Sequence, residues 1–163
     1  MNKAGFLDRD GVINVDVLDY TSKIKDFTFL PGVFEGLKQL QNSGYLLIVI
    51  TNQGGIAKGL YTKEDVDTLH NWMCAELEKQ GITLTAIYFC PHHDVSGKCL
   101  CRKPGGLLLE RAIALLGIDP APSVMIGDRE RDVQSAESAG VRGVLVPANG
   151  DLRNAVKREL RPA

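Results

Sequence analysis

Two acidic residues near the N-terminus, Asp8 and Asp10, directly follow a short apolar run. If that run is a buried strand, side chains at positions i and i+2 leave it on the same side, so both carboxylates point toward one place. Two like charges held that close together repel each other. The pair therefore indicates a site for a metal ion, a shared proton or a cationic ligand.

Further polar residues follow apolar runs later in the chain. Thr51 and Asn52 come after the second run, Gly127-Asp128 comes after a later one, and Lys103 follows a cysteine-rich loop. A third carboxylate beside the first two would form an oxygen site of the kind that Mg²⁺ prefers. Thr51 offers a hydroxyl to an anion, and Lys103 offers a compact positive charge. Acids, a metal, a lysine and a hydroxyl are together typical of phosphoryl transfer, in which catalysis is mostly positioning and charge neutralisation.

A second set of potential metal ligands lies between residues 90 and 101. Three thiolates and one imidazole suit a closed tetrahedral Zn²⁺ site, which leaves no open position for catalysis and is therefore structural. The predicted ligands are Cys90, His92, Cys99 and Cys101. We interpret His93 as a neighbour of this site, and the residues alone leave open whether it contacts zinc or substrate. The metal would offset the ordering entropy of the loop and hold Arg102 and Lys103 against the active site.

Apolar runs of strand length alternate with helical patterns along the chain. The pattern predicts strands at residues 4–7, 46–50, 86–89, 124–126 and 144–146, and helices from 33 to near 44, from 62 to near 77, and at 107–116, 130–139 and 151–160. This alternation predicts an α/β fold with a doubly wound, Rossmann-like parallel sheet that helices cover on both faces. Ligands of such sheets bind beyond the carboxyl ends of the strands, near the topological switch point. The predicted polar groups would therefore gather on one rim.

The length of 163 residues indicates one domain, which we expect to span residues 1–163 with the zinc loop 90–101 inserted before the third helix. Two long irregular segments, 14–30 and 90–106, are too short to form a separate cap domain, so we expect an open site. Loops of that length inside a compact domain are usually functional. The specificity of the site would therefore come from the loops at 14–30, 52–60 and 90–106.

The charged residues are balanced, with 19 Lys and Arg against 20 Asp and Glu. The absence of clustered basic residues with aromatics argues against nucleic-acid binding. No apolar run approaches the ~18 residues that span a bilayer, and the few residues before Asp8 are too short for a signal-peptide core. We therefore expect a cytoplasmic monomer that acts on a small molecule and makes no contact with nucleic acid or membrane. In a reducing compartment, clustered cysteines bind metal more readily than they form disulfides.

Four short motifs, taken in order, resemble those of the haloacid-dehalogenase superfamily of phosphatases. They are Asp8-Arg9-Asp10-Gly11, Thr51-Asn52, Lys103 and Gly127-Asp128. No single motif is specific, but four in order, each after the appropriate strand, are strongly specific. The resemblance implies hydrolysis of phosphoric monoesters by a Mg²⁺-dependent phosphatase.

The same resemblance implies a role for each matching residue. Asp8 would be the nucleophile that forms an aspartyl-phosphate, and Asp10 would be the general acid and then the general base. Asp8, the main-chain carbonyl of Asp10 and Asp128 would hold Mg²⁺. Thr51 and Lys103 would bind the transferring phosphoryl group.

Within this superfamily, the segments 51–57, 90–93 and 99–104 resemble the D-glycero-D-manno-heptose 1,7-bisphosphate 7-phosphatases. Histidinol-phosphate phosphatases share the zinc loop, and the short spacing after Lys103-Pro104 is nearer to theirs, so this alternative stays open. A catalytically inert phosphosugar-binding zinc protein is an alternative of another class, against which the intact acids argue. The resemblance implies substrate contacts from Asp16, Asp19, Tyr20, Asn52, Gln53, Gly54, Arg102 and Arg129.

Three other residues are given no catalytic role. Strand alternation is expected to point Arg9 away from the acids on either side of it. His70 belongs to an amphipathic helix, which favours a packing role. Asp132 lies one helical turn beyond Asp128, and the pattern leaves open whether it supports the site or is a solvated acid on the helix surface.

Overall fold

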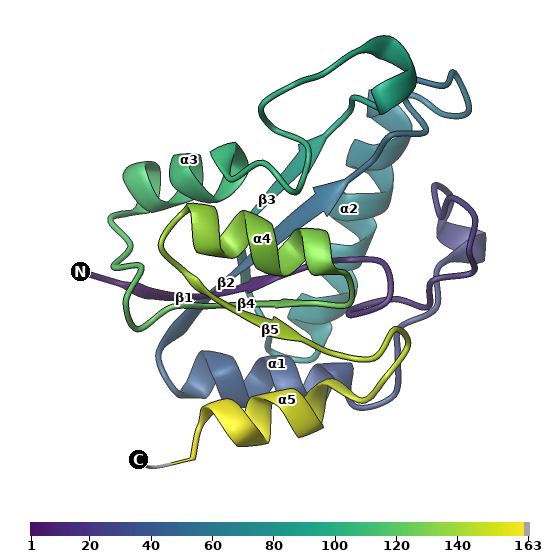
Figure 1. Cartoon of the computed structure of the whole chain (residues 1–163). Coiled ribbons are helices and arrows are strands. Elements are labelled where there is room, and N and C mark those ends of the chain that lie inside the picture. Colours follow the sequence, from purple (N-terminus) through teal and green to yellow (C-terminus); the bar gives the residue numbers. More distant parts are fainter. Residues whose placement is uncertain (162–163) are drawn as a thin grey trace.

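The computed structural model describes residues 1–161, and its centre is a parallel sheet with the strand order β3-β2-β1-β4-β5 (Figure 1). The strands are β1 (Lys3–Leu7), β2 (Tyr45–Asn52), β3 (Leu84–Cys90), β4 (Val124–Gly127) and β5 (Arg142–Leu145). In the central strand β1, Phe6 lies opposite Ile48 of β2 on one side and Met125 of β4 on the other. The chain builds one half of the sheet from β1 to β3 and then the other half from β4 to β5. The switch point therefore lies between β1 and β4, as the doubly wound fold requires.

Helices cover both faces of this sheet (Figure 1). They are α1 (Val33–Asn42), α2 (Lys63–Lys79), α3 (Leu107–Leu116), α4 (Glu130–Ser138) and α5 (Leu152–Glu159), with single 3₁₀ turns at Ile24–Asp26 and Asp94–Ser96. Apolar side chains of α1, α2 and α5 share one core with the sheet, and those of α3 and α4 share the other. For α1 to α4 this division follows from right-handed crossovers, because the chain reverses its direction across the sheet after β3. The predicted fold class is confirmed.

The helix starts follow local capping chemistry. The Thr62 hydroxyl accepts a hydrogen bond from the Asp65 backbone N–H (3.1 Å), and the Asp65 carboxylate accepts one from the Thr62 N–H (2.8 Å). These two reciprocal hydrogen bonds form a capping box at the start of α2. The C-terminal helix prediction is confirmed as well, with the Asp151 side chain accepting from the Arg153 N–H at its start (3.0 Å).

The last strand prediction is wrong by two residues at its start, because the strand is Arg142–Leu145 rather than 144–146. β5 is an edge strand that pairs only with β4, so a polar side chain at its start can reach outward. Arg142 does this by pairing with Glu159 of α5. The apolar pattern therefore does not mark the beginning of this strand.

The loops after β1 and β2 and the loop between β3 and α3 extend from the same end of the sheet (Figure 1). These are the three loops that we expect to form the site. Within residues 1–161, every helix is too short or too polar to span a membrane.

Candidate active site

The site begins where β1 ends beside β4. Asp8 follows β1, and its backbone N–H donates to the carbonyl of Ile126 in β4 (3.0 Å). The chain then turns at Gly11, which has a φ of +86°. A side chain at this position would also collide with the Asp128 carboxylate. The turn after β1 and the end of β4 can approach this closely only because residue 11 is glycine.

Three carboxylates and one lysine meet on this rim. Oxygen atoms of Asp8, Asp128 and Asp132 lie within 4.8 Å of one another. Lys103 Nζ lies 2.9 Å from Asp8 Oδ1 and 2.6 Å from Asp132 Oδ1, and it also donates to the carbonyl of Ile50 (2.9 Å). The lysine side chain is 1% exposed, so its charge depends on these partners rather than on water. The cluster brings together Asp8, Lys103 and Asp128 as the sequence predicts.

Asp132 is the residue in this cluster whose role the sequence left open. It is fully buried, which excludes the interpretation as a solvated helix acid. Its Oδ2 also accepts from the Arg129 backbone N–H at the start of α4 (3.0 Å), so the helix start fixes the carboxylate. The signal in the sequence was its spacing of four residues from Asp128, which places it one turn further along.

Burial and neighbouring charges shift the pKa values of Asp8, Asp128 and Lys103. Burial raises the pKa of Asp8 to about 7, although Lys103 opposes the shift, and it also raises the pKa of Asp128. Burial alone would lower the pKa of Lys103, but the charges of Asp8 and Asp132 outweigh it, so the pKa of this ammonium is raised. Lys103 therefore stays positively charged beside three carboxyl groups. A further cation would stabilise the ionised forms of these acids.

The donor set fits a divalent cation. Both carboxylate oxygens of Asp128 are buried and have no hydrogen-bond partner among the described residues. Arg129 Nε lies 3.7 Å from Asp128 Oδ2, beyond hydrogen-bond distance, and a buried carboxylate without hydrogen bonds is costly unless a cation balances it. Asp8 and Asp128 offer the hard oxygen ligands that Mg²⁺ prefers. The predicted contribution of the Asp10 main-chain carbonyl stays a prediction.

Asp10 belongs to a separate network beside this cluster. Its Oδ1 accepts from Arg9 Nη2 (2.9 Å) and Asn14 Nδ2 (3.0 Å), and its Oδ2 accepts from Gln53 Nε2 (3.3 Å). Gln53 also donates to the Thr51 hydroxyl (3.0 Å). The prediction that Arg9 points away from both acids is therefore wrong for Asp10. Strand alternation fixes where the side chain starts, but a long side chain can return to its neighbour.

A cavity of about 480 Å³ opens at Asp10. Asp16 and Arg129 form an ion pair on its wall (3.2 Å), and Lys58 Nζ lies 5.3 Å from the centre of the Tyr20 ring. Most of the predicted substrate contacts line this cavity. Its lining is Asp10, Asp16, Leu18, Asp19, Tyr20, Thr21, Asn52, Gln53, Lys58, Arg129 and Arg131.

Asn52 lines this cavity, but its side-chain amide is also hydrogen-bonded to the backbone of Lys103. Its Oδ1 accepts from the Lys103 backbone N–H (3.0 Å), and its Nδ2 donates to the Lys103 carbonyl (3.2 Å). The side chain thus fixes the backbone at Lys103, whose ammonium group lies between Asp8 and Asp132. Its two polar atoms are engaged by Lys103, which leaves less capacity for the predicted contact with substrate.

Arg102 and Gly54 are the two predicted substrate contacts that do not line the cavity at Asp10. Arg102 lines a space of about 320 Å³ together with Lys103 and Arg131, and its Nη1 donates to the carbonyl of His92 (3.2 Å). A Cβ atom at Gly54 would lie 2.8 Å from the His93 ring and 3.1 Å from Arg102 Nη1. Gly54 therefore leaves the space in which the loop after β3 packs onto the loop after β2.

The four predicted zinc ligands come together in the loop after β3. The Sγ–Sγ distances are 3.6 Å for Cys90–Cys99, 3.1 Å for Cys90–Cys101 and 3.8 Å for Cys99–Cys101, and His92 Nδ1 lies 3.2 Å from Cys101 Sγ. A tetrahedron with Zn–S bonds of about 2.3 Å has edges of about 3.8 Å, so the set is close to the size that Zn²⁺ requires. His93 is outside it, and its Nδ1 accepts from the Val95 N–H (3.2 Å).

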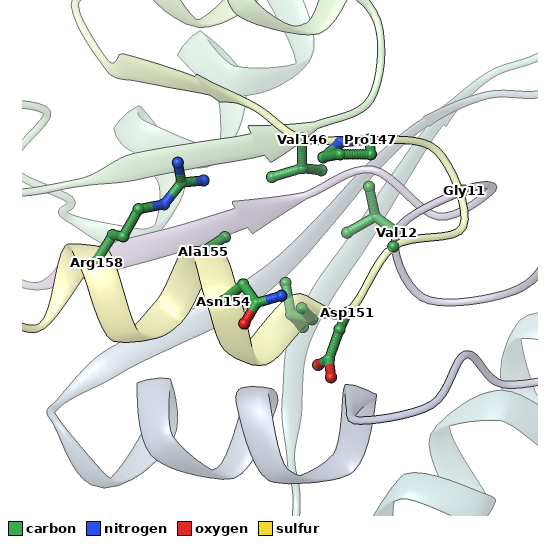
Figure 2. A pocket seen from close by; sticks show the side chains of 10 residues that line it. Gly11, Val12, Val146, Pro147, Asp151, Asn154, Ala155 and Arg158 are labelled. Carbon is green, nitrogen blue, oxygen red and sulfur yellow. The ribbon is translucent and has the colours of Figure 1, made fainter.

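Another cavity, of about 150 Å³, lies behind the Gly11 turn (Figure 2). Val12, Val146 and Pro147 line it together with residues of α5. It contains none of the predicted site residues and shares no lining residue with the cavity at Asp10. We therefore place the candidate active site at the rim of the sheet and not in this cavity.

Known proteins resemble the chain over most of its length. A HAD-hydrolase-like family model matches residues 100–163. The D-glycero-beta-D-manno-heptose-1,7-bisphosphate 7-phosphatase of Haemophilus ducreyi is 44% identical over 154 residues, which cover 91% of this chain and 84% of that protein. The protein of the same name from Escherichia coli K12 is 37% identical, with 97% and 95% covered.

Solved structures agree with these sequence relatives. The crystal structure of a D,D-heptose 1,7-bisphosphate phosphatase from B. bronchiseptica, complexed with magnesium and phosphate, has a TM-score of 0.84 and 31% identity. The similarity covers 98% of this chain and 88% of that one. These relatives share sequence with this chain over nearly its whole length, and the solved structure also shares its fold. In this chain that fold brings the acids and the lysine together on one rim. The chain belongs to the haloacid-dehalogenase-like phosphatases, as a member of the group that contains the heptose 1,7-bisphosphate 7-phosphatases.

Proposed function

We propose that this enzyme removes the 7-phosphate of D-glycero-D-manno-heptose 1,7-bisphosphate in a Mg²⁺-dependent reaction with an aspartyl-phosphate intermediate on Asp8. One observation carries the mechanism: a buried lysine lies between Asp8 and Asp132, beside the carboxylate of Asp128, which accepts no hydrogen bond from the described residues. A carboxylate can attack a phosphate dianion only where positive charge offsets their repulsion. The names of the relatives, at 37–46% identity, support the substrate.

The contacts of Asp8 suggest which of its oxygens attacks. Lys103 Nζ and the Arg9 backbone N–H both donate to Oδ1, each at 2.9 Å. Oδ2 receives neither of these hydrogen bonds and is the oxygen that would bond to phosphorus. Mg²⁺ held by Asp8 and Asp128 would neutralise charge on the phosphoryl oxygens. Lys103 and Thr51 supply further stabilisation from the protein side.

Asp10 handles the proton in this scheme. As the bond between phosphorus and the leaving oxygen breaks, the Asp10 carboxyl gives its proton to that oxygen. The resulting carboxylate then takes a proton from the water that attacks phosphorus in the aspartyl-phosphate. Its side chain is 27% exposed and borders the cavity, which suits an exchange with both substrate and water.

The cavities beside Asp10 suit a phosphorylated sugar. Arg129, Arg131 and Lys58 bring positive charge to the larger one, and Arg102 lies in the neighbouring one. A guanidinium binds two phosphate oxygens at once, so the three arginines suit the phosphate that is not cleaved. All of these groups lie on one sheet with its helices, which supports a single domain. The monomer stays a prediction.

Substrate comparison tests this proposal. We expect heptose 1,7-bisphosphate to give a higher kcat/KM than histidinol phosphate or simple sugar monophosphates, with Mg²⁺ required. Phosphorus NMR of the product should find the 1-phosphate retained. A preference for histidinol phosphate would support the alternative substrate, and a folded protein that turns over none of these compounds would support the inert alternative.

A further inference from the structure

The side chain of Arg9 is fully buried, and the groups that it contacts are other residues of this protein rather than water. Its Nη2 donates to Asp10 Oδ1 (2.9 Å) and to the Thr21 carbonyl (2.6 Å). Its Nη1 lies 3.1 Å from His70 Nε2. A buried guanidinium is expensive unless it is paired, and Asp10 is its only carboxylate partner in the part of the chain that the structure describes. The charge of Arg9 is therefore directed at the residue that is proposed to move the proton.

His70 holds the other side of this guanidinium. A guanidinium only donates hydrogen bonds, so His70 Nε2 must accept and the imidazole must be neutral. Burial, and then the charge of Arg9, lower the pKa of His70 to about 3, in agreement with a neutral ring. The ring also packs edge-on against Phe89, with 5.9 Å between ring centres. A carboxylate at this position would compete with Asp10 for Arg9, whereas a neutral imidazole fixes the guanidinium and leaves its charge to Asp10.

The same contacts distinguish the two oxygens of Asp10. Oδ1 accepts from both Arg9 and Asn14, at 2.9 and 3.0 Å. Oδ2 has one longer contact, to Gln53 at 3.3 Å. An oxygen that accepts two short hydrogen bonds is a poor place for a proton, so the proton of the acid form belongs on Oδ2.

We propose that Arg9, supported by His70 from α2, is a positioning residue that directs the protonated Oδ2 of Asp10 toward the leaving oxygen of the substrate. In the step that it serves, Asp8 Oδ2 bonds to phosphorus, the bond from phosphorus to the leaving oxygen breaks, and the proton passes from Asp10 to that oxygen. This inference rests on the proposed function, because it requires Asp10 to be the general acid.

Leaving-group dependence separates this role from simple packing. The ratio kcat/KM includes every step up to departure of the leaving group. An alkyl or sugar phosphate needs a proton at that point, whereas p-nitrophenyl phosphate has a leaving group that departs without one. Loss of general acid catalysis should therefore lower kcat/KM for the alkyl substrate alone, by ~10²-fold or more when the acid itself is removed.

The experiment compares His70→Leu, which removes the acceptor, with His70→Gln, whose amide oxygen can still accept from Arg9. We expect His70→Leu to lower kcat/KM for a sugar phosphate about tenfold more than for p-nitrophenyl phosphate, and His70→Gln to restore most of this ratio. Arg9→Met should give a larger selective loss, and circular dichroism should verify that each variant folds. Equal losses on both substrates, or no loss in His70→Leu, would refute the inference.

Asp10→Asn is the reference variant, because it removes the acid directly. Suppose that Asp10→Asn lowers kcat/KM for the sugar phosphate only, whereas the Arg9 and His70 variants lower it equally for both substrates. That result refutes the positioning role and leaves the proposed function intact. An unselective loss in Asp10→Asn itself contradicts the proposed role of Asp10, and the inference fails with it.

Discussion

Replacement of His70 by glutamine should make the protein less sensitive to acid. The imidazole of His70 is 5% exposed, and burial and Arg9 lower its pKa to about 3, whereas an unfolded chain has a histidine pKa near 6.5. As the pH falls below about 6.5, the unfolded chain therefore binds a proton that the folded protein does not bind. The stability that His70 contributes is fully present above that pH and is lost progressively as the pH falls toward about 3.

The size of the effect follows from the same two values. At pH 5 an unfolded histidine is almost fully protonated and the folded one is almost fully neutral. Linkage then gives a loss of about 2 kcal/mol in the free energy of unfolding between pH 8 and pH 5 from this residue alone. His70→Gln lacks the titrating group but keeps an acceptor for Arg9, so it should lack this part of the loss.

Urea denaturation of both proteins at pH 8 and pH 5 measures the difference. Trp72 is the single tryptophan and packs against Phe27, with 5.4 Å between ring centres, so its fluorescence reports on this core. Other groups titrate equally in both proteins and cancel in the comparison. We expect the wild-type protein to lose about 2 kcal/mol more than the variant. Equal losses would refute the account of His70 as a buried neutral acceptor.

Three further substitutions test the site. Gly11→Ala should lower activity at least about tenfold, as measured by kcat in steady-state assays, because a methyl group at this positive φ collides with Asp128. Asp132→Asn should lower kcat about 10- to 100-fold by removing one of the two carboxylates that hold Lys103, whereas the exposed Glu130→Gln on the same helix should match wild type. Cys99→Ser should lower the zinc content from about one ion per chain, as measured by elemental analysis, and a wild-type protein that is stable without zinc would contradict the loop assignment.

The acids and the lysine of the site could be found in the sequence because each follows a strand or a loop that the apolar pattern reveals. In a parallel sheet the carboxyl ends of the strands share one edge, so Asp8, Thr51 and Asp128 lie on the same rim whatever the details of packing. The cluster of predicted zinc ligands was equally visible, because the chemistry of three cysteines and a histidine in one short loop is independent of the rest of the fold.

The contacts that the sequence did not reveal are made across long separations by side chains whose position depends on packing. Asn52 binds the backbone of Lys103 across 51 residues, and Arg9 reaches His70 across 61. Strand alternation gives the direction of the Arg9 Cβ but not the position of its guanidinium. An amphipathic pattern favours a packing role for His70 but identifies neither its burial nor its partner. The burial of Asp132 likewise depends on how closely α4 packs on β4.

Detection of the phosphoenzyme tests the central claim most directly. Asp10→Asn should still be phosphorylated by p-nitrophenyl phosphate but should hydrolyse the aspartyl-phosphate slowly, because it lacks the base that activates water. Mass spectrometry of the acid-quenched protein should then find one phosphoryl group on the peptide that contains Asp8, and none in an Asp8→Asn/Asp10→Asn double variant. Turnover by Asp8→Asn at the wild-type rate, or a phosphoryl group on a residue other than Asp8, would contradict the account.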